Sequence, residues 1–443
     1  MANRAQFSSR IGFILAAAGS AVGLGNIWGF PTQAASNGGA VFLMVYLLMV
    51  FALAYPLLVA ELTIGRYGNA DPITSLRKVW PQQKALMGLV GLAGMIAVSL
   101  ILSFYAIVAG WLLGYLLAPI CEAAGLVSLA HWLETFSSGR NLVLMLIFMW
   151  LTVMVVRSGV ADGIEKWSTR LMPVLLLLFV VMVIYILTQD GAWAGLRLYL
   201  VPDFSHLSPK LIVSAMGQAF FSLSLGVCTM MVYGSYLSKS ANLPKTAAQV
   251  ALLDTGVAFI AGMLILPAMF VAQHNGVVIY DESGALLASD TLVFSVLPTM
   301  FDTMGPVGMI VGILFFVLMI IAALTSSISM LEVPVSCAIE ELNLKRHTAV
   351  WWIGGFICVI SAVIVFNFDA LFGRVVIMTT AYAQPIIGMI FALLVGWIWH
   401  RDKVLQEIRK GYPAVESSLF WRIWPWYVRI VCPVLMLLVF FVQ

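Results

Sequence analysis

Charged residues are scarce in this sequence. Asp, Glu, Lys and Arg make up 10% of its 443 residues, whereas hydrophobic residues make up 62%. Soluble domains carry about 25% charged residues, so this composition excludes an ordinary soluble protein. Long apolar runs recur from one end to the other, which indicates an integral membrane protein. The first run is too long for a cleavable signal peptide and lacks a small-residue cleavage site.

Patterns for metal, redox or nucleotide chemistry are also lacking. The five cysteines are scattered, and no two have the spacing of a metal site or a disulfide framework. The five histidines fall in loops or at the ends of apolar runs, whereas a haem or metal enzyme of the membrane needs ligating histidines inside its spans. There is no Walker-type phosphate loop, and the net charge of +3 gives no nucleic-acid signal. These absences disfavour a redox enzyme and an ATP-driven pump.

The apolar runs predict one membrane domain with eleven spans. The spans lie near residues 11–36, 41–65, 87–118, 141–157, 167–188, 210–236, 247–272, 304–337, 348–368, 371–399 and 421–443. Two outer segments, residues 189–209 and 273–302, are longer than the other loops. Each is either a solvated connector or a lid over an outward cavity.

Basic residues set the predicted orientation. With the N-terminus in the cytoplasm, only four of the 23 Lys and Arg residues lie outside, namely Arg140, Arg197, Lys210 and Arg374. The excess on the inner side follows the positive-inside rule, and the opposite orientation would reverse it. An odd number of spans then places Gln443 outside.

Two spans are interrupted near their middle. The first reads AAAGSAVGLGN at 16–26, and the sixth reads FFSLSLGV at 220–227. Glycine weakens a helix by about 1 kcal/mol relative to alanine, and freed backbone groups at membrane depth must face protein or a water-filled cavity. Two broken helices in matching places are a pointer to the binding site of a secondary transporter. They also indicate two related halves, spans one to five and six to ten.

Asp254 is the most informative ionisable residue. It lies inside the seventh span, well past Lys245, and no nearby span carries a basic residue. A charge at the bilayer centre costs about 2.5–3.5 kcal/mol, so Asp254 either is protonated or holds a cation. The eighth span carries LTSS at 324–327. A single hydroxyl usually bonds back to its own helix, but three in succession can supply the oxygen ligands that hard cations prefer.

These motifs resemble the neurotransmitter:sodium symporter family in its bacterial amino-acid branch. The motifs that carry the resemblance are GSAVGLGN (19–26), FP (30–31), NGG (37–39), GRYG (65–68), GQAFFSLSLG (217–226) and LTSS (324–327). They occur in family order over nearly the whole chain. The resemblance implies an all-α membrane protein with a LeuT-like fold, with inverted five-helix repeats at 11–188 and 210–399 and an eleventh helix at 421–443. It further implies a bacterial inner (plasma) membrane protein without an obligate protein partner.

Transferred residue by residue, the resemblance implies two sodium sites. The first would use the Ala21 carbonyl, the side chains of Asn26, Ser222 and Asp254, and the substrate carboxylate. The second would use the carbonyls of Gly19, Val22 and Ala322 with the hydroxyls of Thr325 and Ser326.

The resemblance also implies where an α-amino acid would bind. Its carboxylate would meet the amides of Leu24 and Gly25 and the Tyr105 hydroxyl, at the positive end of a half-helix. Its amino group would meet the carbonyls of Ala21, Phe221 and Ser224, and its side chain a pocket of Ile101, Phe221, Val227, Ser326 and Met330. Gly23 offers no anion to a bare amine, which favours an amino acid over a monoamine. Val227 and Met330 favour branched, sulfur-containing or aromatic side chains.

Chloride independence is a further expectation from the resemblance. Chloride-dependent relatives carry a serine one turn after the position of Asp254, and here that residue is Ala258. Tyr46, Gln218 and Ser222 remain as chloride contacts, but the carboxylate of Asp254 would already offset the sodium charge.

The family's gates are matched only in part. At the inner side the matching residues are Arg4, Phe7, Tyr236 and Glu340, with Gly163 and Pro173 as the pair whose helix unwinds. At the outer side the usual arginine is replaced by Gly29, while its partner survives as Asp369. Arg374 either takes the place of the missing arginine or forms a local surface pair of little energetic worth.

The sequence therefore predicts a symporter that couples Na⁺ to the import of hydrophobic L-amino acids by alternating access and changes no covalent bond. One alternative is proton coupling or proton counter-transport through Asp254. Another alternative is a ligand-gated leak channel or substrate sensor on the same fold. It is retained because position 29 is glycine and not the arginine of the outer gate.

Overall fold

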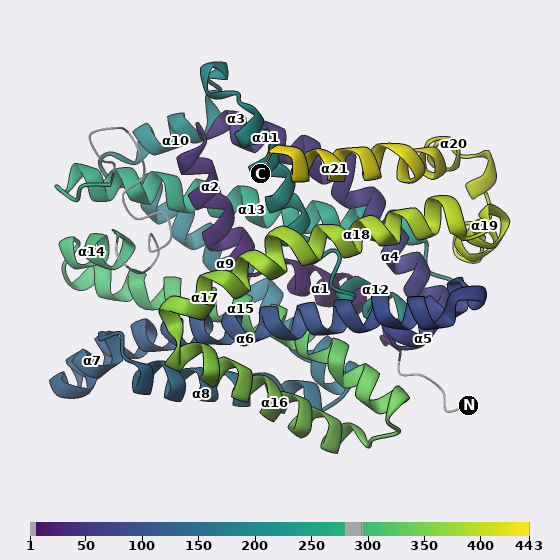
Figure 1. Ribbon diagram of the computed structural model, residues 1–443. Coiled ribbons are helices and arrows are strands. Elements are labelled where there is room, and N and C mark those ends of the chain that lie inside the picture. Colours follow the sequence, from purple (N-terminus) through teal and green to yellow (C-terminus); the bar gives the residue numbers. More distant parts are fainter. Residues whose placement is uncertain (1–5, 280–293, 295, 443) are drawn as a thin grey trace.

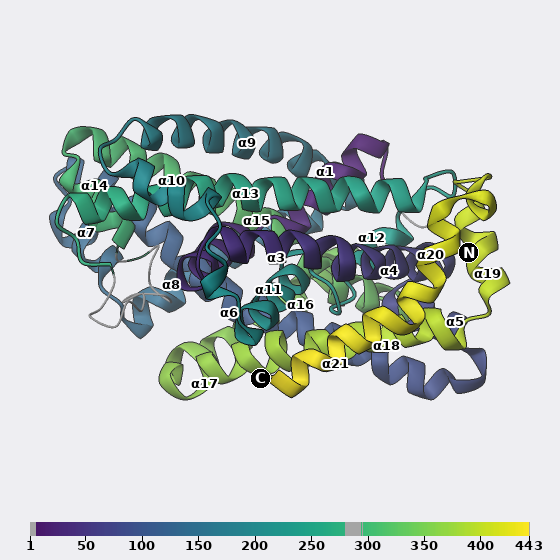
Figure 2. The same cartoon turned by 90° about the horizontal axis from the view of Figure 1, so that it is seen from above.

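The computed structural model describes residues 6–279, 294 and 296–442. Long helices run side by side along one common direction (Figures 1 and 2). The end that carries α5, α12 and α19 is called the inner end below, after the predicted orientation, and the end that carries α7, α10 and α14 is called the outer end (Figure 1).

The first half of the chain contains helices α1 to α9 with short π- or 3₁₀-helical stretches labelled η. Their bounds are α1 (Arg10–Ala21), η1 (Gly25–Gly29), α2 (Phe30–Ser36), α3 (Ala40–Met49), η2 (Val50–Ala54), α4 (Tyr55–Gly68), α5 (Pro72–Val79), η3 (Pro81–Gln83), α6 (Lys84–Ala123), α7 (Val127–Glu134), α8 (Ser138–Arg157), η4 (Val160–Glu165) and α9 (Lys166–Leu187).

Two short elements at the outer end, α10 and η5, precede the helices of the second half. The bounds are α10 (Ala192–Leu200), η5 (Phe204–His206), α11 (Pro209–Ser222), α12 (Thr229–Ser235), α13 (Leu243–His274), α14 (Val296–Thr303), α15 (Pro306–Glu341), α16 (Arg346–Phe366), α17 (Phe368–Val376), η6 (Ile377–Ala383), α18 (Gln384–Leu393), η7 (Leu394–Ile398), α19 (Arg401–Arg409), η8 (Val415–Ser417), α20 (Leu419–Trp426), η9 (Tyr427–Val431) and α21 (Cys432–Val442).

Within the described residues, eight helices are long and apolar enough to cross a bilayer, and the bent pair Arg10–Ala21 and Gly25–Ser36 makes a ninth. The other two expected spans also fall on helical segments. Residues 210–236 correspond to α11 and α12 on either side of a break, and residues 421–443 to the run of α20, η9 and α21. The all-helical membrane fold expected from the sequence is confirmed.

The first expected break lies where the glycines predict it. α1 ends at Ala21, Val22 adopts an extended conformation (φ −70°, ψ 105°), and the chain resumes as a helix bent by 54°. The second break spans residues 223–228, where Ser224, Gly226 and Cys228 have φ values of 51°, 75° and 62°. Left-handed conformations end a helix, and glycine adopts them at the least cost. The second helix is therefore interrupted by left-handed residues, and the first by the extended Val22 beside Gly23.

The two outer loops contain more structure than plain connectors would. The segment at 189–209 carries α10 and η5. In the segment at 273–302, residues 280–293 lie outside the described part of the chain, and α14 begins at Val296.

Candidate functional site

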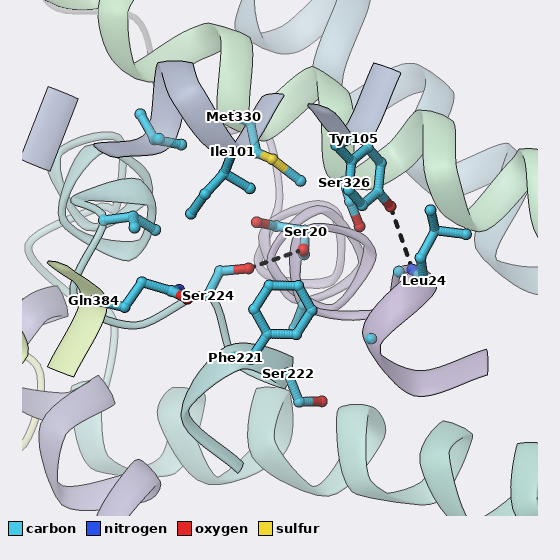
Figure 3. Close-up of a pocket in the computed structure, with 15 residues that line it drawn as sticks. Ser20, Leu24, Ile101, Tyr105, Phe221, Ser222, Ser224, Ser326, Met330 and Gln384 are labelled. Carbon is cyan, nitrogen blue, oxygen red and sulfur yellow. Dashed lines mark hydrogen bonds between the residues drawn. The ribbon is translucent and has the colours of Figure 1, made fainter. Parts of the chain in front are cut away.

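A cavity lies between the two broken helices. Its volume is about 30 Å³, and Figure 3 shows the side chains that line it. Every residue predicted to contact substrate lines this cavity: Ala21, Gly23, Leu24, Gly25, Ile101, Tyr105, Phe221, Ser222, Ser224, Val227, Ser326 and Met330. Ser20, Val98 and Gln384 line it too, and the sequence reasoning missed them. Five segments that are far apart in the sequence therefore supply one site.

The backbone of the first break faces the cavity. The Leu24 amide donates to the Tyr105 hydroxyl at 3.3 Å, so an amide at the start of the second half-helix points toward this space. A Cβ on Gly23 would lie 2.5 Å from the Ser326 Oγ and 2.9 Å from the Tyr105 Oη. Glycine is required here by close approach, and the position has no room for a fixed side-chain anion.

Asp254 is completely buried on α13 beside the break in the first span. The Asn26 Nδ2 donates to its Oδ1 at 2.7 Å, and the Ser222 Oγ donates to its Oδ2 at 2.8 Å. The Gly23 amide donates to the Asn26 Oδ1 at 3.1 Å. Within the described residues, no basic side chain forms an ion pair with Asp254. This group combines a carboxylate, a hydroxyl and an amide oxygen, which suits a hard monovalent cation.

The residues predicted for the second sodium site also contact one another. The Ser326 Oγ donates to the Val22 carbonyl at 3.0 Å and to the Gly19 carbonyl at 3.3 Å. The Thr325 Oγ1 donates to the Ala322 carbonyl at 3.0 Å. The Ser326 contacts bring carbonyls near the first break against a hydroxyl of α15, whereas Thr325 bonds within α15. Together these groups offer the oxygen ligands that a hard cation prefers.

The chain is similar to known proteins over nearly its whole length. The model of the sodium:neurotransmitter symporter family matches residues 4–123 and 133–443. An uncharacterised sodium-dependent transporter of Bacillus subtilis, YhdH, is 35% identical over 98% of this chain and 96% of its own length. This chain belongs to the sodium:neurotransmitter symporter family.

A eukaryotic transporter and a solved bacterial structure are also similar to the symporter. The human sodium- and chloride-dependent taurine transporter is 27% identical over 96% of this chain and 75% of its own length. The crystal structure of MhsT in complex with L-phenylalanine superposes with a TM-score of 0.86 at 38% identity, and the match covers 99% of both chains. The LeuT-like fold is thus shown, as is the assignment to a family of sodium-dependent transporters rather than enzymes.

Tyr46 and Gln218, two of the residues of this symporter expected to contact chloride, interact with other protein groups instead. The Tyr46 hydroxyl lies 3.5 Å from the Ser222 Oγ, and the Gln218 Nε2 donates to the Gly25 carbonyl at 2.7 Å. Ala258, one turn after Asp254, is fully buried and brings no hydroxyl.

At the inner end, two of the expected gate residues, Phe7 and Tyr236, contact each other, and Glu340 contacts Asp71. The Phe7 amide donates to the Tyr236 carbonyl at 3.3 Å, and their rings lie 6.2 Å apart. The Glu340 Oε2 accepts from the Asp71 amide at 2.9 Å, and burial raises the pKa of Asp71 above its ordinary value. Arg4 lies outside the described residues.

Gly163 and Pro173, the pair whose helix is expected to unwind, both lie in helical segments in this conformation. Gly163 is in η4, where a Cβ would lie 2.3 Å from the Val155 carbonyl oxygen, and Pro173 is in the following α9. Sequence reasoning missed their neighbour Glu165, which is 95% buried and accepts from the Ser8 amide at 2.7 Å and the Ser8 Oγ at 2.8 Å. Ser9 donates to the same carboxylate through its amide (3.2 Å) and its hydroxyl (3.1 Å).

At the outer end, the charged residues expected at the gate do not meet. Asp369 and Arg374 are both exposed on α17, and they form no ion pair with each other. Gly29 faces Gln218, whose Oε1 would lie 3.3 Å from an added Cβ.

Aromatic rings occupy this end instead. Trp28, beside Gly29, packs on Phe294 at 5.8 Å, and Phe294 packs on Trp111 at 5.5 Å. Trp111 also contacts Phe368 and Phe372 of α17 at 5.8 and 5.9 Å. These rings form the aromatic cluster of the outer end.

Proposed function

We propose that this protein is a symporter that couples sodium to the import of hydrophobic L-amino acids and works without chloride. The observation that carries the proposal is the contact between the cavity of the two breaks and the buried oxygen group of Asn26, Ser222 and Asp254. A zwitterion in the cavity would place its carboxylate between the amides near Leu24 and a sodium ion held by that group. Substrate and ion would then each complete the other's site.

The substrate class rests on the pocket and on one relative. Ile101, Val227 and Met330 give the cavity an apolar wall, and MhsT was crystallised with L-phenylalanine. The second sodium is proposed where Ser326 contacts the Gly19 and Val22 carbonyls of the first break, with Thr325 and the Ala322 carbonyl beside it on α15. Each Na⁺ that crosses a 100 mV potential releases about 2.3 kcal/mol from the electrical term, so two ions would drive substantial accumulation.

The same contacts would support alternating access. Sodium would hold the outward-open form, and substrate would complete the first sodium site and allow the outer end to close. Loss of the second sodium through the inner end, where the helix of Gly163 and Pro173 would unwind, would then open the cytoplasmic path.

Uptake into proteoliposomes tests this proposal. A Na⁺ gradient should drive accumulation of labelled phenylalanine or leucine, and replacement of chloride by gluconate should leave the rate within about twofold. A large loss of rate in gluconate would contradict chloride independence. Asp254→Asn should weaken sodium activation, because it removes the only carboxylate of the group.

Proton coupling is the second candidate, because the same buried carboxylate of Asp254 could carry a proton. Separate Na⁺ and pH gradients distinguish the two. Accumulation driven by a pH gradient in Na⁺-free buffer would favour the proton-coupled alternative. Counterflow of labelled substrate would exclude a sensor, which does not exchange label, and a channel, which shows no saturable exchange.

A further inference from the structure

Gln384 has a buried side-chain oxygen that accepts no hydrogen bond from the residues the structure describes. The residue opens α18, lines the cavity and is 2% exposed. Its Nε2 donates to the Leu225 carbonyl at 3.2 Å. Within the described part of the chain, its Oε1 accepts no hydrogen bond. A buried acceptor of this kind is uncommon and costly, so it calls for an explanation.

The orientation of this amide is fixed by its neighbour. A carbonyl such as that of Leu225 can only accept, so the nitrogen of Gln384 must face it. The oxygen then lies on the other branch of the amide, and Figure 3 shows the side chain directed toward the drawn cavity residues beside Ser224. Gln384 therefore offers an acceptor on that branch, while both N–H groups stay on the branch that faces Leu225.

The serine hydroxyls nearest this wall cannot satisfy the oxygen. The Ser224 Oγ donates to the Ser20 carbonyl at 3.3 Å, and the Ser20 Oγ donates to the Ser329 Oγ at 2.7 Å. Each hydroxyl has a single proton, which these bonds already use. The donor that completes Gln384 must come from a molecule inside the cavity.

Much of the remaining cavity wall is apolar. Val98, Ile101, Val227 and Met330 line it, and all four are at most 8% exposed. A side chain that suits both walls has a large apolar body and one polar hydrogen at its edge. Indole and phenol rings have this form, whereas aliphatic side chains and the phenyl ring lack the polar hydrogen.

We propose that the Gln384 Oε1 accepts a hydrogen bond from the substrate side chain and selects aromatic amino acids with a ring donor, tryptophan and tyrosine, over phenylalanine. This inference rests on the proposed amino-acid transport and names the substrate class of the same site. In the conformation described, the 30 Å³ cavity has room for about two waters. The ring therefore enters a more open form of the site and displaces water from the Gln384 oxygen.

The test measures sodium-dependent binding to the purified full-length protein with two matched ligand pairs. The first pair is tryptophan and 3-(benzothiophen-3-yl)alanine, which replaces the indole N–H by sulfur at nearly the same shape. The second pair is tyrosine and phenylalanine. In each pair the donor-bearing ligand should bind at least about 10-fold more tightly, because the other leaves a buried acceptor unpaired.

Gln384→Leu should reduce both preferences to less than about twofold, mainly by weakening tryptophan and tyrosine. Gln384→Met, which is closer in length, provides a second variant if the first unfolds. Met330→Leu on the apolar wall is the control, and it should change both members of a pair by the same factor. A preference that Gln384→Leu leaves intact would overturn the inference.

Equal binding within both pairs in the wild type would also overturn it, since water alone would then satisfy Gln384. The proposed function would still stand in that case, because phenylalanine and its relatives would bind with sodium. If none of the four ligands bound in a sodium-dependent manner, the proposed function and this inference would both fail.

Discussion

Charged side chains join the helices at the inner end of the bundle, whereas aromatic rings join them at the outer end. At the inner end, the fully buried Glu332 accepts from the Tyr236 Oη at 2.6 Å and from Arg346 at 2.5 and 3.1 Å. Arg66 and Glu407 form a second pair at 2.8 Å, with both side chains 1% exposed. At the outer end, among the described residues, the ring contacts of Trp28, Phe294 and Trp111 join the helices instead of ion pairs.

The two kinds of contact differ in how they respond to motion. Breaking a buried ion pair by removing one partner costs about 3–5 kcal/mol, because the other charge stays unpaired. An aromatic pair contributes about 0.5–1.5 kcal/mol beyond its buried area, and its geometry tolerates offset and tilt. The inner end thus has strong, directional bonds in addition to the ring contacts of Phe7, whereas the ring contacts of Trp28, Phe294 and Trp111 at the outer end are individually weak and do not depend on salt.

The strongest test of this difference is Arg346→Ala. The change leaves the carboxylate of Glu332 buried without its main partner, so the inner end should open more often, by about 100-fold for a loss near 3 kcal/mol. Cys337, 3% exposed on α15, is a native reporter of that opening. Its alkylation rate, followed by mass spectrometry, should rise accordingly.

The matched control for Arg346→Ala is the double variant Arg346→Ala with Glu332→Gln, which removes the unpaired charge. It should restore much of the protection of Cys337. Equal labelling of the single variant and the wild type would mean that the pair does not hold the inner end closed.

A smaller effect is expected from Glu165→Gln. This change removes the charge that accepts four hydrogen bonds from Ser8 and Ser9, and bonds to a charged group contribute about 1.5–3 kcal/mol. Hydrogen exchange of the amides at the start of α1 should become faster, by about 10-fold or more.

Gly12→Ala should act like Glu165→Gln, since a Cβ there would lie 1.8 Å from the Glu165 Oε1. Gly139→Ala is the matched control, because nothing lies within 4 Å of its added Cβ. If Gly12→Ala exchanged as slowly as Gly139→Ala, the carboxylate would not hold the start of α1.

Trp28→Leu should have a weaker effect at the outer end. It removes the ring contact with Phe294, which is worth about 1 kcal/mol, so bound substrate should dissociate about fivefold faster. The change in rate should be the same at low and at high salt. A strong salt dependence would indicate that charges, and not rings, close this end.

Arg374→Ala should have the smallest effect. Arg374 is exposed and forms no ion pair with Asp369 in this conformation. Even a pair formed at the surface would contribute only about 0–1 kcal/mol, so a local surface role predicts a transport rate within about twofold of the wild type. A large loss of transport, repeated in Asp369→Asn, would instead favour a role for Arg374 in place of the arginine missing at Gly29.

The sequence predicted the breaks well because their cause is local. Gly23 and Gly226 weaken their own helices, so the positions of both interruptions can be derived from composition at membrane depth. The candidate site could be placed because the family motifs carry most of its residues. Gln384 could have been found as a lone glutamine in the apolar run that follows Arg374, since a polar residue inside a span needs a reason.

The contacts that the sequence did not predict join residues far apart in the chain. Glu165 meets Ser8 across 157 positions, and Arg66 meets Glu407 across 341. No local pattern pairs such residues. The missing pair of Asp369 and Arg374 has a simple geometric reason, because five residues of α-helix turn by about 140° and place the two on different faces.

α4 and α12 touch through their backbones. A Cβ on Gly65 would lie 1.9 Å from the Met231 carbonyl oxygen, and one on Gly234 would lie 2.7 Å from that of Leu62. Because the two backbones are in such close contact, we expect α4 and α12 to move as one rigid unit. The non-helical segment at 223–228 would then act as a hinge between the α4–α12 pair and α11. Rotation at this hinge would move the cavity wall and the inner end together.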